Sequence, residues 1–114
     1  MNILNRPFPT TILTSKVDDA SGGFAGVAAV ANKKILVWGL LLTAPAGHTL
    51  TFQSNTTALT GPLATTGLLL EPPQRASSAG GYPRFETAAG EAFNIVADSA
   101  VQVSGIVYYT TESE

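Results

Sequence analysis

Short apolar runs, broken at regular intervals by glycine and proline, constrain the fold more than any other feature of this sequence. The 114 residues include 11 glycines and 7 prolines, and the segments between them are rich in Val, Ile, Thr, Phe and Tyr. Such runs, recurring at roughly 8 to 12 residues, are typical of β-strands joined by turns. The sequence therefore predicts an all-β protein with little helix.

The expected strands differ in their pattern of apolar residues. The run 34–44, KILVWGLLLTA, is apolar on both faces, as a strand in the middle of a packed sheet is. The run 48–54 alternates, which places Leu50 and Phe52 inward and the polar residues between them outward. A helix over residues 25–34 is the weaker alternative, because glycines precede and interrupt it. The expected strands cover residues 10–16, 24–31, 34–44, 48–54, 57–61, 65–71, 84–88, 92–98 and 100–112.

The spacing of these strands also predicts their architecture. Strands of unequal length with one long loop, residues 72–83, favour an antiparallel β-sandwich with jelly-roll connections over a regular barrel. A chain of this length forms a single domain, which we expect to span residues 11–114. Residues 1–10 are expected to form an extended arm, because Pro7 and Pro9 each remove a backbone donor and restrict the chain; a frayed terminus is the alternative.

The stretch TFQSNTTALTGPL, residues 51–63, has two interpretations. It is dense in hydroxyl and amide groups, which suits a polar contact surface. It also contains two short alternating runs on either side of Asn55 and Thr56, and asparagine tolerates the left-handed backbone of a tight turn. The second interpretation, a hairpin that reverses at these two residues, is favoured.

Charge and composition exclude several classes of function. Charged residues make up 12% of the chain and the net charge is −2, and the six basic residues are scattered, so no basic patch for nucleic acid is expected. The longest apolar run has about ten residues, half of what a membrane-spanning helix needs. The N-terminal stretch lacks the long apolar core of a secretory signal.

The residues that often carry chemistry lack suitable partners in the sequence. His48 is the one histidine, and we expect it to be a solvated residue of a turn, because neither a nucleophile nor an orienting acid stands near it. Glu86 and Glu91 flank a turn and form at most a weak candidate pair for glycoside hydrolysis. Asp18 and Asp19 lack the spacing of a calcium loop. We therefore expect no enzyme activity, cofactor, metal site or small-molecule substrate.

Three ordered blocks carry a resemblance to a known group of proteins. The pattern TxTFxS…TxLTGP falls on Thr49–Pro62, FxTAxGExLNI on Phe85–Ile95 with Phe93 in place of its Leu, and VQVxGxVxY on Val101–Tyr109. Together with the apolar strand before them, these blocks cover about two thirds of the chain. This part resembles small phage structural proteins, and none of the blocks is a catalytic motif.

The resemblance implies a virion protein with a β-sandwich fold. The most direct expectation is a head decoration or cement protein, made in the host cytoplasm, that binds major capsid subunits on the head exterior, stabilises the shell and forms a homotrimer. A receptor-binding or carbohydrate-binding module of a tail or fibre is the alternative. The expected partner-binding residues lie in the arm and in the long loop: Ile3, Leu4, Arg6, Phe8, Arg75 and Tyr82.

Overall fold

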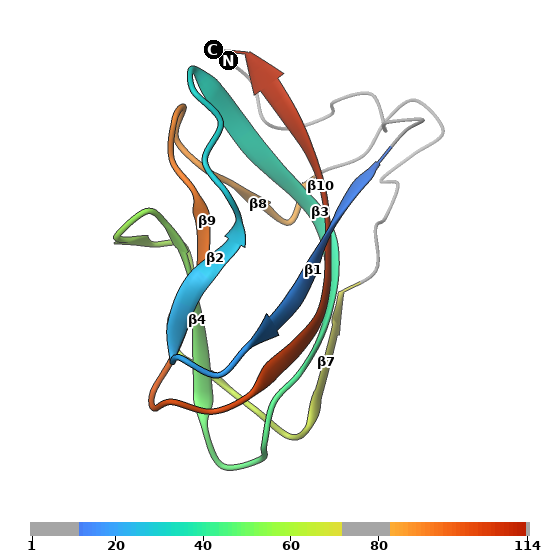
Figure 1. Cartoon of the computed structure of the whole chain (residues 1–114), viewed down its shortest axis with the longest axis vertical. Coiled ribbons are helices and arrows are strands. Elements are labelled where there is room, and N and C mark those ends of the chain that lie inside the picture. The colour runs from blue at the N-terminus through green and yellow to red at the C-terminus, as the bar shows by residue number, and fades with distance from the viewer. Residues whose placement is uncertain (1–11, 72–82, 114) are drawn as a thin grey trace.

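The computed structural model describes residues 12–71 and 83–113, and the regular structure within these residues is entirely β-strand. No helix long and apolar enough to cross a membrane occurs in this part of the chain. Two sheets lie face to face with a core between them (Figure 1). The strands are Leu13–Asp19 (β1), Gly23–Val27 (β2), Lys33–Thr43 (β3), Thr49–Ser54 (β4), Thr57–Ala58 (β5), Leu63–Ala64 (β6), Leu68–Glu71 (β7), Phe85–Glu86 (β8), Phe93–Ala97 (β9) and Val103–Ser113 (β10).

The order of the strands is that of a jelly roll. The first sheet has the order β1–β10–β3–β7, with β8 also paired to β3, and the second has the order β2–β9–β4–β5, with β6 also paired to β4. The short strands β7 and β8 share one edge of β3, and β5 and β6 share one edge of β4. Each sheet thus has four strand positions, all antiparallel, and β1 to β4 alternate between the sheets. The predicted jelly-roll sandwich is confirmed.

Three of the predicted strands agree closely with the structure. The runs 34–44, 48–54 and 92–98 correspond to β3, β4 and β9. Leu50 and Phe52 point inward as predicted and are each 1% exposed. These strands were predictable because their apolar residues lie in the core, so burial and sequence pattern agree.

The predictions were wrong where turns and exposure override the pattern. Residues 28–30 are exposed and belong to no strand, so the strand predicted over 24–31 ends at Val27, and the alternative helix is also wrong. The first strand starts at Leu13 and continues to Asp19, three residues past its predicted end. The strand predicted over 57–61 shrinks to β5, and the unpredicted β6 follows it.

The hairpin predicted to reverse at Asn55 and Thr56 is confirmed. Asn55 has a φ of 53° and forms a two-residue turn with Thr56 between β4 and β5, where Ser54 pairs with Thr57. This left-handed backbone is one that asparagine accepts more readily than most residues. The hydroxyl-rich stretch is therefore explained by strand pairing.

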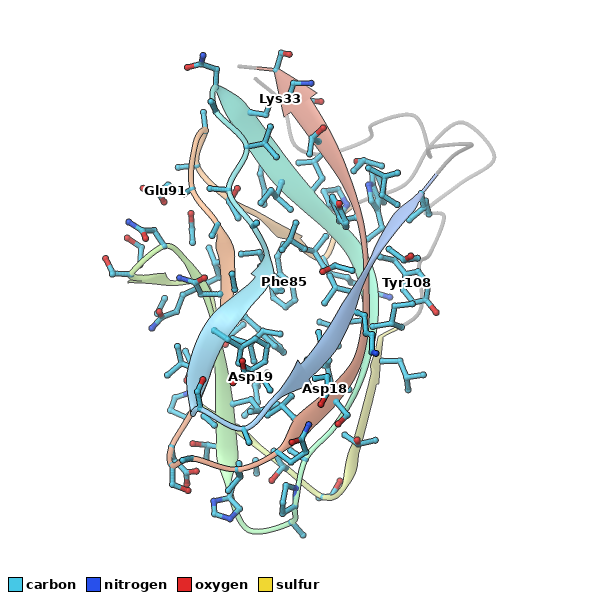
Figure 2. The ribbon with its side chains drawn as sticks, in the orientation of Figure 1. Asp18, Asp19, Lys33, Phe85, Glu91 and Tyr108 are labelled. Atoms are coloured by element: carbon cyan, nitrogen blue, oxygen red, sulfur yellow. The ribbon has the colours of Figure 1, made fainter. Side chains whose placement is uncertain are left out.

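The core is formed by inward residues of both sheets. Its centre is aromatic: the ring of Phe52 lies 5.2 Å from that of Phe85 and 5.6 Å from that of Phe93. Figure 2 shows Phe85 between the sheets. The indole of Trp38 is buried outside this core cluster, and its Nε1–H donates to Oγ1 of Thr110 at 2.9 Å. The buried core cluster consists of Val17, Val27, Ile35, Val37, Leu40, Leu42, Ala44, Leu50, Phe52, Phe93, Ile95, Val103 and Val107.

Residues 87–91, which belong to the second of the three resembling blocks, are hydrogen-bonded to β3 and β4. Thr87 is 2% exposed, its Oγ1 accepts the backbone N–H of Ile35 at 2.9 Å, and its own N–H donates to the Ile35 carbonyl at 3.0 Å. The hydroxyl of Ser54, also buried, donates to Oε1 of Glu91 at 2.6 Å. The turn glycine Gly90 has a φ of 78°. These residues hold neighbouring strands together.

Candidate functional site

Several connections meet at one end of the sandwich, which we call the loop end and define as residues 20–22, 44–48, 65–67 and 98–102. In Figure 1 these connections lie at the bottom of the view. Backbone bonds link them: Gly47 N–H donates to the Thr65 carbonyl at 3.3 Å, and Ala97 N–H donates to the Gly22 carbonyl at 2.8 Å. The loop end is therefore a single surface built from segments far apart in the sequence.

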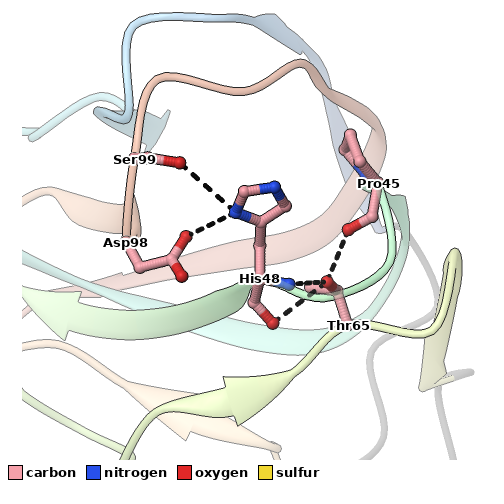
Figure 3. A network of polar contacts seen from close by, with 5 residues as sticks. All are labelled: Pro45, His48, Thr65, Asp98 and Ser99. Carbon is pink, nitrogen blue, oxygen red and sulfur yellow. Dashed lines mark hydrogen bonds and ion pairs between the residues drawn. The ribbon is translucent and has the colours of Figure 1, made fainter.

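His48 stands at the centre of the loop end. Its Nδ1 lies 2.9 Å from Oδ1 of Asp98 and 3.3 Å from Oγ of Ser99 (Figure 3). The side chains of His48 and Asp98 are 30% and 42% exposed. The expectation that His48 has no acid or hydroxyl partner was wrong, because the pairing of β4 with β9 brings residues 48 and 98 together.

Thr65 connects the same histidine to the neighbouring loop. The Thr65 hydroxyl donates to the carbonyl of Pro45 at 2.6 Å and accepts the backbone N–H of His48 at 3.1 Å. The backbone N–H of Thr65 in turn donates to the His48 carbonyl at 2.8 Å. Thr65 therefore fixes the connection between β3 and β4, and with it the position of the imidazole (Figure 3).

An apolar pocket adjoins this polar network. It opens beside Thr65, and Leu63 at its rim is 37% exposed. A single exposed leucine is ordinary on a protein surface and the hollow is small, so the pocket by itself identifies no ligand. The pocket is lined by Leu42, Ala44, Leu50, Leu63, Ala64, Thr65, Thr66 and Gly67.

The chemistry of the network favours positioning over catalysis. In a hydrolytic triad, one imidazole nitrogen binds the acid and the other takes the proton of the nucleophile. Here the carboxylate of Asp98 and the hydroxyl of Ser99 both lie at Nδ1 of His48. The ring therefore links two loops without activating the serine, and no step of hydrolysis follows from this geometry.

The acidic residues near the loop end are each bound to polar side chains. Oδ1 of Asp19 accepts the backbone N–H of Ser21 at 2.7 Å and also the Ser21 hydroxyl. Both bonds lower the pKa of Asp19 below its ordinary value of 3.8, and the bond from the Ser21 hydroxyl has the larger effect. Oδ1 of Asp18 accepts Nε2–H of Gln102 at 2.7 Å. Among the described residues, no three His, Cys, Asp or Glu side chains group together in a way that would hold a metal ion.

Glu86 and Glu91, the candidate pair for glycoside hydrolysis, bind different partners. Oε2 of Glu86 lies 3.0 Å from Nζ of Lys34, and both side chains are largely buried. Glu91 instead accepts the hydroxyl of Ser54. Each carboxylate therefore has a structural role in strand pairing, so the geometry gives no support to a catalytic pair.

The partner-binding residues predicted from the sequence lie outside the described residues. Ile3, Leu4, Arg6 and Phe8 precede residue 12, and Arg75 and Tyr82 fall between residues 71 and 83. The loop end is the site that sequence reasoning missed. The sequence contains one signal for it, which is that His48 and Asp98 both lie in polar turns. This signal indicates a shared site only when β4 and β9 are known to be neighbours.

Comparisons of the chain with protein-family models, with curated proteins and with solved structures found no match.

Proposed function

We propose that this protein is a structural component of a phage virion, a decoration or cement protein on the head exterior. In this role it binds major capsid subunits and stabilises the shell, and it has no enzymatic activity. The observation that carries the proposal is that the sequence blocks resembling phage structural proteins have structural roles. Ser54, Thr87 and Glu91 belong to these blocks and hold strands together.

The surface of the sandwich supports a binding role. With 12% charged residues, the chain has few ions to desolvate when a partner covers it. At the loop end the apolar pocket with Leu63 lies beside the ordered polar groups of Thr65 and His48. An apolar centre with a polar rim is the usual composition of a protein–protein interface.

The N-terminal arm, residues 1–10, is the second proposed attachment point. Ile3, Leu4 and Phe8 are apolar, and burying each against a partner contributes roughly 1.5 to 3 kcal/mol before ordering is counted. Fixing each residue of a flexible segment costs about 1 to 2 kcal/mol. We therefore expect the arm to bind only where the partner also supplies backbone hydrogen bonds.

Reconstitution on heads that lack the protein tests the proposal. Purified heads are heated with and without the recombinant chain, and DNA release is followed. The chain should saturate the heads and raise the temperature of release, and a cryo-EM map of the decorated particle should show it on the outside. Heads that neither bind the protein nor gain heat resistance would refute the cement role. Labelled antibody that decorates tails would instead support the carbohydrate-binding or receptor-binding alternative.

Two variants separate the attachment points. Deletion of residues 1–9 should leave thermal unfolding of the isolated protein nearly unchanged and weaken capture by heads at least tenfold. Leu63→Asp places a charge at the rim of the loop-end pocket and should weaken capture if this surface meets the shell. Thr57→Asp is the control, because it adds the same charge at an exposed position of β5. If the truncated chain binds as tightly as the full chain, the arm is not an attachment point.

A further inference from the structure

Strand β1 forms an edge of the first sheet. It pairs with β10 along its whole length, from Leu13 opposite Tyr109 to Asp19 opposite Val103, without a register shift. Within the part of the chain that the structure describes, β1 has no partner strand on its other side. The strand contains neither proline nor glycine. Its outer edge therefore offers backbone N–H and C=O groups to a further strand.

The side chains of β1 carry a charge pattern that is complementary to itself. Lys16 and Asp18 are exposed, whereas Val17 between them is buried in the core. Residues two apart on a strand share a face, so the ammonium and the carboxylate lie side by side on the outer face of the sheet. Gln102 binds Asp18 through a neutral amide, which leaves the charge of this carboxylate uncompensated.

We propose that β1 of a second copy of this chain pairs antiparallel with β1, around a two-fold axis at Val17. In this register Lys16 of each copy lies opposite Asp18 of the other, where directly opposed Cβ atoms are about 4.5 to 5.5 Å apart. The two first sheets then join into one continuous sheet. Because β1 ends at Asp19, the strand residues that face each other in this register run from Ser15 to Asp19 of each copy.

The neighbouring registers are unfavourable. An axis at Lys16 places two ammonium groups opposite each other, and an axis at Asp18 places two carboxylates together. Like charges at opposed positions destabilise a strand pair. A shift of one residue in the pairing also turns the charged side chains of one strand toward the core face of the other. The charges therefore select the axis at Val17.

This pairing closes with two copies, because the same edge serves both partners. It differs from the homotrimer expected from the sequence, in which two different surfaces of each copy would meet around a ring. The pair does not depend on the proposed capsid role, since it concerns the isolated chain. If the chain did not bind heads, the proposed pair would not be refuted, and if the chain did not pair, head binding would not be refuted.

Sedimentation of the full chain over a series of concentrations, with charge-swap variants, tests the pair. The wild type should sediment with the mass of two chains. Lys16→Asp and Asp18→Lys should each raise the dissociation constant at least tenfold, because each opposes like charges. An equimolar mixture of the two variants and the double variant Lys16→Asp/Asp18→Lys should both recover the pair. Thermal unfolding of each variant provides the control for folding.

Cysteine cross-linking tests the register separately, since the chain has no cysteine of its own. In the proposed register Thr14 lies opposite Ala20 of the second copy. A mixture of Thr14→Cys and Ala20→Cys should form a disulfide-linked pair under mild oxidation. Thr14→Cys alone should not, because its two copies are then about 20 Å apart along the strand.

Four results would overturn the proposal. The wild type could sediment with the mass of one chain up to millimolar concentration, or with the mass of three chains. The charge-swap variants could sediment with the same mass as the wild type, or their equimolar mixture could fail to form the pair. Cross-linking of Thr14→Cys to itself would overturn the register.

Discussion

Replacing Gly105 with alanine should strongly destabilise this protein. Gly105 lies in β10 opposite Leu42 of β3 and has a φ of 147°. A Cβ at this position would overlap the carbonyl oxygen of Leu41 and lie 2.9 Å from its carbonyl carbon and from Cα of Leu42. These are backbone atoms, so no side-chain rotation relieves the overlap.

The magnitude follows from two additive effects. A non-glycine residue in such a backbone conformation costs about 1 to 3 kcal/mol. Forcing an extra carbon into a packed region costs about 1 to 3 kcal/mol or more, because β10 must move away from β3. The sum, about 2 to 6 kcal/mol, is a large part of the 5 to 15 kcal/mol that stabilises an ordinary domain. For a domain of this size, the midpoint of thermal unfolding should fall by roughly 10 to 25 °C.

Two other glycines separate these effects. Gly47 has a φ of 88° but nothing within 4 Å of an added Cβ, and Gly61 has neither a positive φ nor a neighbour within that distance. Thermal unfolding followed by circular dichroism should therefore rank the alanine variants Gly61, Gly47 and Gly105 in order of increasing loss. If the Gly105 and Gly47 variants melt within about 3 °C of each other, the close approach of β10 to β3 does not explain the glycine.

Two further predictions concern buried and exposed hydrogen bonds. Thr87→Val removes the acceptor of the Ile35 N–H and should lower the free energy of unfolding in urea by about 1 to 3 kcal/mol; Thr87→Ser should lose less, and equal values would contradict the role of the hydroxyl. Ser21→Ala should raise the pKa of Asp19 toward 3.8, as measured by carbon NMR titration. Because the pKa of Asp19 is lowered in the folded protein, its bonds stabilise the protein above about pH 4, and this stability is lost as the pH falls through the folded pKa. The free energy of unfolding of the variant should therefore fall less steeply in acid than that of the wild type. An unchanged titration of Asp19 would contradict this cause.

The sequence by itself determined the fold class and the identity of much of the core. The two-residue alternation of β4 and the continuous apolar run of β3 report which side chains are buried, and Asn55 marks a turn through its own backbone preference. Each of these signals is local, so it remains readable without knowledge of the neighbours. The boundaries of β2 and β5 were not predictable, because exposure and pairing decide where short strands end.

Only the tertiary structure decided which strands are neighbours, and with that the candidate site. His48 and Asp98 are 50 residues apart and meet because β4 pairs with β9, and Ser54 reaches Glu91 for the same reason. An alternating pattern shows which face of a strand is buried, but it is the same whichever strand lies beside it. The edge position of β1 among the described strands is likewise invisible in the sequence, because it depends on which strands lie beside it. Local chemistry therefore determined the elements, and non-local pairing determined the surfaces that we propose as binding sites.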